Sequence, residues 1–220
     1  MRLLEALKTA FRLLILDKKS MAIVMWKLRR GDSTLRVEYD LNPESLVFDV
    51  GGYRGEWALK MASRYDCNIH IFEPVDEYCR EIDRQLGGNP KVVINNTGLS
   101  DKTEKHLISI DEAGSSVIKL GGKVMEIQLI DIDQYVSGLN IRRIDLIKMN
   151  IEGGEYALLS RMHERDLIRS CVDIQIQFHD FIPDAPARRN ELREILSATH
   201  DLTYDYPFIW ENWHLRDSGN

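Results

Sequence analysis

The chain has 220 residues, of which 44% are hydrophobic and 29% charged, a composition that excludes disordered and fibrous proteins and suits one α/β domain. No apolar run approaches the ~20 residues that cross a bilayer. The three cysteines match neither a zinc motif nor a redox pair, so we expect reduced thiols in a cytoplasmic protein.

The net charge of −6 is unevenly distributed along the chain. Residues 1–30 hold eight basic and two acidic residues and carry +6, which leaves −12 for the remainder. Because nucleic acids are polyanions, an acidic body argues against nucleic acid as a substrate. The basic N-terminus needs its own explanation.

Residues 1–43 are predicted to form an N-terminal helical arm and a connection. Apolar side chains recur at helical spacing over 3–16, with Lys8 and Arg12 on another face, and a second apolar run covers 21–26. The arm packs as a helix pair on the flank of the domain or in a homodimer, or its basic face rests on an anionic membrane at the inner membrane face. Packing on the flank of the domain or in a dimer contact is favoured over the membrane, because short amphipathic helices usually face a core.

From residue 44 to residue 220, predicted strands and helices alternate. Such alternation indicates βαβ crossovers and a parallel sheet, so the predicted fold class is α/β, a doubly wound Rossmann-like sheet. The predicted strands cover 46–50, 69–72, 91–94, 145–149 and 172–178, and the predicted helices lie within 57–65, 76–86, 131–136, 155–162 and 183–199.

One stretch interrupts this alternation. Two runs, 105–110 and 125–130, have strand character and flank a segment rich in glycine and serine. We expect an inserted β-hairpin here, with Ser115 and Ser116 on a flap. The aromatic-rich tail over 202–215 predicts the last strands; most of its rings are expected to pack against the sheet, although aromatic faces also suit sugar rings.

The loop Asp49-Val50-Gly51-Gly52-Tyr53-Arg54-Gly55 follows the first predicted strand and precedes a helix. Glycines let the backbone turn sharply and approach a ligand, and free N–H groups at the start of the helix suit a carboxylate or a phosphate. Because the second glycine directly follows the first, the pyrophosphate pattern of NAD-binding loops fails, and the spacing favours S-adenosyl-L-methionine. The alternative is a tight turn without a ligand. The candidate cofactor-binding residues here are Asp49, Gly51, Gly52, Tyr53 and Gly55.

Glu73 ends the second predicted strand, 18 residues after Gly55. In nucleotide-binding α/β folds, an acid at this place accepts hydrogen bonds from the ribose hydroxyls. The alternative is an exposed acid at a strand end. The glycine loop and Glu73 together favour a nucleoside-binding site.

Several segments resemble, in order and spacing, the FkbM family of methyltransferases. These are residues 47–56, Phe72-Glu73-Pro74, Leu99-Ser100-Asp101 and residues 144–155, which read Ile-Asp-Leu-Ile-Lys-Met-Asn-Ile-Glu-Gly-Gly-Glu. The match covers about residues 45–180, and the last segment is its most specific part.

The resemblance implies S-adenosyl-L-methionine as the methyl donor and, usually, O-methylation. It also implies an acceptor that is often a sugar in a glycan, a glycolipid or a natural product. By position in the family pattern, Gly98-Leu99 would pass the adenine, and Asn150 belongs to the cofactor and catalytic region. The family usually has Asp where this chain has Asn150, which weakens a carboxylate base or a metal ligand at this position.

Candidate catalytic residues follow the fourth and fifth predicted strands, at the carboxyl edge where such sheets bind ligands. Glu152 is the carboxylate best placed to take a proton from an acceptor hydroxyl, and its alternative role is to bind loop amides. His179 is the alternative base, with Asp180 or Glu152 to orient it. The catalytic candidates are therefore Glu152, His179 and Asn150.

Lys148 lies within an apolar strand, and a buried lysine needs a partner. We expect that partner to be Glu152 or Glu155. The spacing of Glu152, His179 and Asp180 is no metal signature, so no metal site is predicted.

The favoured function is that of an S-adenosylmethionine-dependent O-methyltransferase. An NAD-dependent oxidoreductase on a Rossmann fold is the second candidate, and the Gly51-Gly52 pair argues against it. A non-catalytic nucleoside-binding module is the third, and Asn150 in place of Asp keeps it open.

Overall fold

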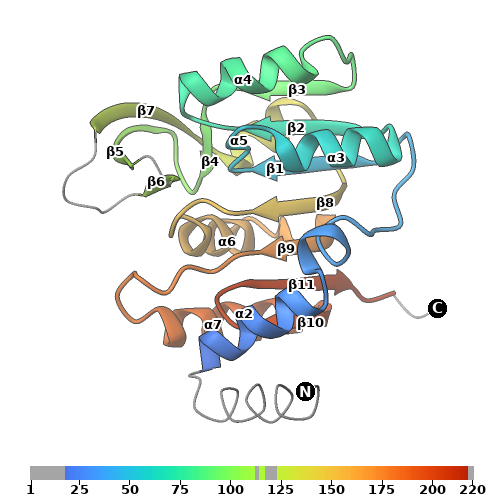
Figure 1. Cartoon of the computed structure of the whole chain (residues 1–220), viewed down its shortest axis with the longest axis vertical. Helices are drawn as coiled ribbons and strands as arrows, with labels where there is room; N and C mark the ends of the chain where they lie inside the picture. Colours follow the sequence, from blue (N-terminus) through green and yellow to red (C-terminus); the bar gives the residue numbers. More distant parts are fainter. Residues whose placement is uncertain (1–17, 112–113, 117–122, 218–220) are drawn as a thin grey trace, which may run out of the picture.

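The short apolar runs of the sequence form a central sheet, because strands that are buried on both faces pair with one another. The computed structural model describes residues 18–111, 114–116 and 123–217 (Figure 1). The strands of the large sheet are β1 (Leu46–Val50), β2 (Asn68–Phe72), β3 (Val92–Asn95), β8 (Ile144–Met149), β9 (Cys171–Ile176), β10 (His200–Tyr206) and β11 (Trp210–Leu215).

Within the described residues, this sheet has seven strands in the order β10-β11-β9-β8-β1-β2-β3. The pairs β1–β2, β2–β3, β1–β8 and β8–β9 are parallel, whereas β11 is antiparallel to both of its neighbours. The predicted doubly wound α/β class is confirmed. Strand order reverses direction between β1 and β8, and ligands of such sheets bind beyond the carboxyl ends of the strands at that point.

Helices cover both faces of the sheet because each presents an apolar side to it (Figure 1). One core contains Trp57 and Ile82 with sheet residues such as Val47. The other contains Tyr156 and Leu192 with sheet residues on the opposite face. The helices are α3 (Glu56–Tyr65) and α4 (Asp76–Leu86) on the first core, and α5 (Ile132–Gly138), α6 (Glu155–Glu164) and α7 (Ala185–Ser197) on the second.

The predicted β-hairpin is present as part of a second, smaller sheet with the order β4-β7-β5-β6. The two long strands β5 and β7 pair antiparallel, and one face of the pair packs through Ile108 and Ile127 against Val75 and Tyr78 at the start of α4. β4 was not predicted, because its three residues are too few for a recognisable period. The bounds are β4 (Gly98–Ser100), β5 (Glu104–Asp111), β6 (Gly114–Ser116) and β7 (Lys123–Asp131).

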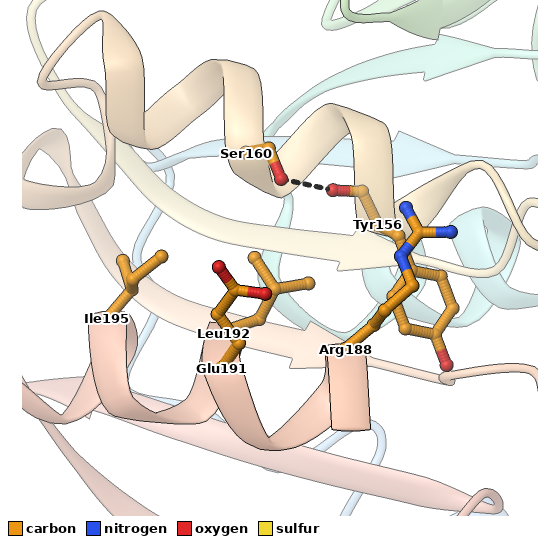
Figure 2. Close-up of a pocket in the computed structure, with 6 residues that line it drawn as sticks. All are labelled: Tyr156, Ser160, Arg188, Glu191, Leu192 and Ile195. Atoms are coloured by element: carbon orange, nitrogen blue, oxygen red, sulfur yellow. Dashed lines mark hydrogen bonds between the residues drawn. The ribbon is translucent and has the colours of Figure 1, made fainter. Parts of the chain in front are cut away.

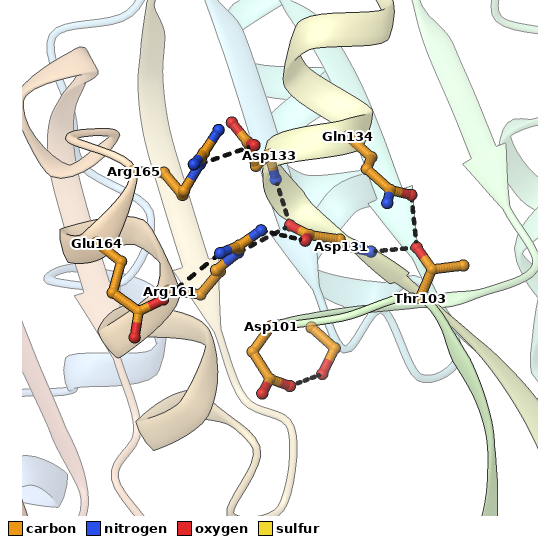
Figure 3. Close-up of polar contacts among 9 residues, drawn as sticks. Asp101, Thr103, Asp131, Asp133, Gln134, Arg161, Glu164 and Arg165 are labelled. Atoms are coloured by element: carbon orange, nitrogen blue, oxygen red, sulfur yellow. Dashed lines mark hydrogen bonds and ion pairs between the residues drawn. The ribbon is translucent and has the colours of Figure 1, made fainter.

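Ion pairs fix the end of β7 and the start of α5 to the C-terminal end of α6 (Figure 3). Arg161 Nη2 donates to Asp131 Oδ2 at 2.7 Å, and Arg165 Nε donates to Asp133 Oδ2 at 2.8 Å. Asp131 also caps α5 by accepting the Asp133 N–H at 2.8 Å, while its own N–H donates to Thr103 Oγ1 at 3.0 Å. The network therefore holds the inserted strands at a fixed place beside the main sheet.

The N-terminal arm is described from α2 (Lys18–Leu28) onward. Its Trp26 is buried, with its ring 5.1 Å from Tyr206, so α2 packs on β10 as favoured, while Met21, Met25 and Leu28 are exposed. The helix predicted over 3–16 lies outside the described residues, so contact with a membrane and a homodimer stay predictions. No helix in the described ranges is long and apolar enough to cross a membrane.

The predicted connection, residues 31–43, lies across one face of the sheet. Trp57 Nε1 of α3 donates to the Arg36 carbonyl oxygen at 2.8 Å. Further along, the Tyr39 hydroxyl donates to Asn212 Oδ1 of β11 at 3.1 Å. The segment therefore contacts elements that lie far apart in the sequence, and α2 follows the same side of the molecule (Figure 1).

Candidate functional site

The glycine loop lies at the carboxyl ends of β1, β2 and β8. The N–H groups of Gly51 and Gly52 donate to the Phe72 carbonyl oxygen at 2.9 and 3.2 Å. Gly51 has a φ of 84°, and a Cβ atom there would lie 2.0 Å from the Asn150 carbonyl oxygen. Only glycine permits this approach, so the loop is held tightly between the neighbouring strand ends.

Lys148 forms a buried ion pair under this loop. Its Nζ donates to Asp49 Oδ1 at 2.8 Å and to the Gly51 carbonyl oxygen at 2.7 Å, and the residue is only 3% exposed. The prediction that Lys148 pairs with Glu152 or Glu155 is therefore wrong. The register of the sheet explains the difference, because Asp49 and Lys148 lie opposite each other on the adjacent strands β1 and β8.

Two buried oxygen atoms at this place suit a cationic group. Asp49 Oδ2 and Asn150 Oδ1 have no hydrogen-bond partner among the residues that the structure describes. Asn150 directly follows β8, and its N–H donates to the Val50 carbonyl oxygen at 3.0 Å, so its backbone lies beside the residue that follows Asp49. Buried acceptors without a donor are uncommon. These atoms therefore fit the ammonium group of S-adenosyl-L-methionine.

Glu73 joins the end of β2 to the glycine loop. Its Oε2 accepts the Tyr53 N–H at 2.7 Å, and its Oε1 accepts the Val75 N–H at 2.9 Å. Burial raises the pKa of Glu73 to about 7, although these two N–H groups oppose the rise. Each carboxylate oxygen keeps capacity for a further donor, so the group fits the ribose hydroxyls of a nucleoside.

The other predicted cofactor residues differ in exposure. Tyr53 is exposed, and its ring lies 4.7 Å from that of Tyr78. Leu99 is buried in the core, so an adenine passing this point would meet the backbone of residues 98–99 rather than the tip of the side chain. Gly55 is the N-cap residue of α3 and has a φ of 83°.

The buried carboxylate of Glu155 holds His179 beside Glu152. Glu155 was not predicted as a partner of His179. Glu155 Oε1 lies 3.0 Å from His179 Nδ1 and accepts the His179 N–H at 2.8 Å. On the other side of the ring, Glu152 Oε2 is 3.7 Å from Nε2. Burial lowers the pKa of His179, but the hydrogen bond and the charge of Glu155, with smaller effects of Glu152 and Asp180, outweigh burial and raise it.

Asp180 does not orient His179, which corrects one of the two predicted arrangements. Its Oδ2 lies 2.5 Å from Lys19 Nζ of α2. Glu155 is the residue that contacts His179 Nδ1. The sequence indicated it in one way only, because it is the last acidic residue of the segment 144–155 that resembles the family. In the described part of the chain, no three His, Cys, Asp or Glu side chains form a group that could hold a metal ion.

Aromatic side chains near His179 support it and extend the site. The Tyr156 hydroxyl donates to the His179 carbonyl oxygen at 2.8 Å. The Phe181 ring lies 5.3 Å from the imidazole and is 46% exposed. Trp210 and Trp213 of the tail are buried, so they pack against the sheet as expected. Phe181 is therefore the exposed aromatic ring beside the candidate base.

A hollow of about 40 Å³ lies behind this region, between α6 and α7 (Figure 2). Small-molecule sites usually enclose ≈ 300–1,000 Å³, so the hollow is too small for a cofactor or a sugar. Arg188 lies over the ring of Tyr156 there, 5.0 Å from its centre. The hollow is lined by Tyr156, Ser160, Arg188, Glu191, Leu192 and Ile195.

Known proteins share this sequence pattern and this fold. An alignment of 203 positions gives 23% identity to the AMB antimetabolite synthetase AmbE of Pseudomonas aeruginosa, and it covers 73% of this chain but only 10% of that protein. The chain resembles the structure of a proposed rRNA-methylase from Clostridium thermocellum, with a TM-score of 0.50, 10% identity and coverage of 86% of this chain and 97% of the other. A proposed methyltransferase from Streptococcus mutans in complex with S-adenosylhomocysteine gives a TM-score of 0.47 at 6% identity, covering 80% and 91%.

The similarity to the Clostridium thermocellum structure shows the fold, and a match to a family model shows the family. The model of the methyltransferase FkbM domain matches residues 49–206, which is most of the chain and includes the glycine loop, Glu73, Glu152 and His179. The family match therefore supports a methyltransferase over the oxidoreductase. The chain belongs to the FkbM family and is an S-adenosylmethionine-dependent methyltransferase.

Proposed function

We propose that this methyltransferase methylates a hydroxyl group of a sugar in a glycan, a glycolipid or a natural product. The observation that carries the proposal is the imidazole of His179 between two carboxylates at the carboxyl edge of the sheet. A hydroxyl is a weak nucleophile until its proton is removed, so its methylation needs a base. A neutral amine attacks through a free electron pair, so a buried and oriented base favours oxygen as the acceptor atom.

The residues of the site divide the work between binding and proton transfer. Bound S-adenosyl-L-methionine supplies an electrophilic methyl group. Asp49 and Asn150 would hold its ammonium, and Glu73 would accept its ribose hydroxyls. His179 takes the acceptor proton, and Glu152, 3.7 Å from Nε2, stabilises the imidazolium that results.

Phe181 supports a sugar as the acceptor. Its exposed ring lies beside His179, where the apolar face of a sugar can pack against it. The acidic body disfavours nucleic acid, although some structural neighbours are described as rRNA methylases. AmbE bears the name of an antimetabolite synthetase, which agrees with a natural product as the acceptor. We further propose that the enzyme acts in the cytoplasm.

The proposed function is tested with S-adenosylmethionine labelled in its methyl group. The full chain is incubated with a panel of sugars and glycosides, and with amino sugars and free amines as controls. We expect labelled methyl ethers, identified by mass spectrometry and NMR. Labelled product that carries the methyl group on nitrogen alone would refute O-methylation.

The role of Glu73 is tested without an acceptor. Glu73 must be ionised for both of its oxygens to accept ribose hydroxyls, and its pKa is about 7. S-adenosylhomocysteine should therefore bind about tenfold more weakly at pH 6 than at pH 8. Glu73→Gln should weaken binding by about 10- to 100-fold. In this variant, the affinity should no longer change tenfold between pH 6 and pH 8. Calorimetry measures both effects, with the exposed Glu77→Gln as the matched control and NAD as the control ligand. Equal affinities of the wild type and Glu73→Gln would remove Glu73 from the site.

A further inference from the structure

Glu155 is a buried carboxylate with an unusual set of donors. It is the first residue of α6 and is 0% exposed. Its Oε2 accepts the Gly153 N–H at 2.9 Å, and its Oε1 contacts both the backbone N–H and the ring Nδ1 of His179. Burial of an ionised carboxylate costs free energy unless hydrogen-bond donors replace the lost water molecules, and these N–H groups do so. The same oxygen atom therefore fixes the loop that carries His179 and the rotation of its ring.

The proton on the neutral imidazole follows from this contact. An ionised carboxylate can only accept, so the nitrogen that faces it must donate. His179 Nδ1 lies 3.0 Å from Glu155 Oε1, and its proton is therefore placed on Nδ1. The lone pair is then left on Nε2, because the nearest Glu152 oxygen, Oε2, lies 3.7 Å away and is beyond hydrogen-bond distance.

We propose that Glu155 is a positioning residue, which holds His179 in the tautomer whose Nε2 takes the proton of the acceptor hydroxyl. This inference rests on the proposed function for its meaning in catalysis. The proton of the acceptor hydroxyl moves to Nε2, and an electron pair of the oxygen forms the new bond to the methyl carbon. The bond between that carbon and the donor sulfur would break with its electron pair left on sulfur, so that S-adenosylhomocysteine is the leaving group. The imidazolium then carries a proton on each nitrogen, one toward Glu155 and one toward Glu152, and it returns the second proton to water after turnover.

The charged groups around His179 make Glu155 the main influence on it. Glu155 is in direct hydrogen-bond contact, whereas Glu152 is 3.7 Å away and partly exposed. Asp180 follows in the chain, but its carboxylate lies 2.5 Å from the ammonium of Lys19. A purely structural Glu155, which only capped α6 through Gly153, would leave the imidazole free to carry its proton on either nitrogen.

Nitrogen-15 NMR of the histidine side chains tests this inference on the full chain without an acceptor. The spectrum of a His179→Gln variant assigns the signals. In the wild type above the pKa of His179, we expect a protonated Nδ1 and an unprotonated Nε2. In Glu155→Gln, the pKa of His179 should fall by about one unit or more, because the neighbouring charge is gone. Glu164→Gln, an exposed acid of the same helix, should leave both signals unchanged.

Two outcomes would overturn the inference. One is a neutral His179 that carries its proton on Nε2 in the wild type, a result that needs no variant and holds even if Glu155→Gln does not fold. The other is a folded Glu155→Gln in which the tautomer and the pKa match the wild type. Neither measurement depends on methyl transfer, so a failure of the sugar O-methylation assay leaves this test intact, and the reverse also holds.

Discussion

Replacement of His179 by alanine is expected to lower kcat for methyl transfer by about 10²- to 10⁴-fold, the usual contribution of a positioned general base. The affinity for S-adenosylhomocysteine should stay unchanged, because the cofactor contacts that we propose come from the glycine loop, Glu73 and Asn150. A loss in kcat without a loss in cofactor binding identifies an interaction that is made in the transition state.

Single-turnover methyl transfer to an acceptor found in the panel, together with calorimetry, provides the measurement. His163→Ala serves as the matched control, because His163 is an exposed histidine on α6 and should leave kcat unchanged. Glu152→Gln should lose less activity than His179→Ala, since it only removes the charge beside the imidazolium. Full activity of His179→Ala together with a large loss in Glu152→Gln would make Glu152 the base instead.

The activity of the wild type should also depend on pH through His179. Its pKa lies above the ordinary value, so the base form increases as the pH rises through that raised pKa, and kcat should rise with it. In Glu155→Gln the rise should move to lower pH. A pH profile of kcat that is the same in Glu155→Gln and in the wild type would show that His179 does not take the acceptor proton.

Replacement of Lys148 by methionine is expected to lower the free energy of unfolding by about 3–5 kcal/mol. The change leaves the fully buried Asp49 carboxylate without its charged partner and removes the donor to the Gly51 carbonyl oxygen. Cofactor binding should weaken as well, because the glycine loop loses one of its fixed points.

A double variant separates stability from function at this pair. Asp49→Leu combined with Lys148→Met replaces the ion pair by apolar groups, which is often neutral for stability. We therefore expect the double variant to regain most of the lost stability but not the affinity for S-adenosylmethionine, since the free oxygen of Asp49 is gone. Urea unfolding and calorimetry measure the two effects, and Lys60→Met on the exposed side of α3 is the control. A stable double variant that binds the cofactor as tightly as the wild type would show that Asp49 does not contact it.

The sequence by itself determined the class of the fold and the position of the cofactor loop. Apolar runs with strand character became β1 and β8, and helical spacing became α4 at the predicted residues 76–86. These features are local, because a strand buried on both faces and a helix with one apolar side each have their own period in the sequence. The glycine loop and Glu73 could be identified for the same reason. Their predicted roles depend only on their place directly at the end of a strand, which is also a local feature.

Only the tertiary structure decided which side chains meet. Lys148 pairs with Asp49, 99 positions away, because the register of β1 and β8 places them opposite each other. His179 meets Glu155 rather than Asp180, because the loop after β9 folds back onto the start of α6 while Asp180 turns to α2. Such contacts depend on strand register and on the approach of distant segments, and a pattern of neighbouring residues carries no information about either.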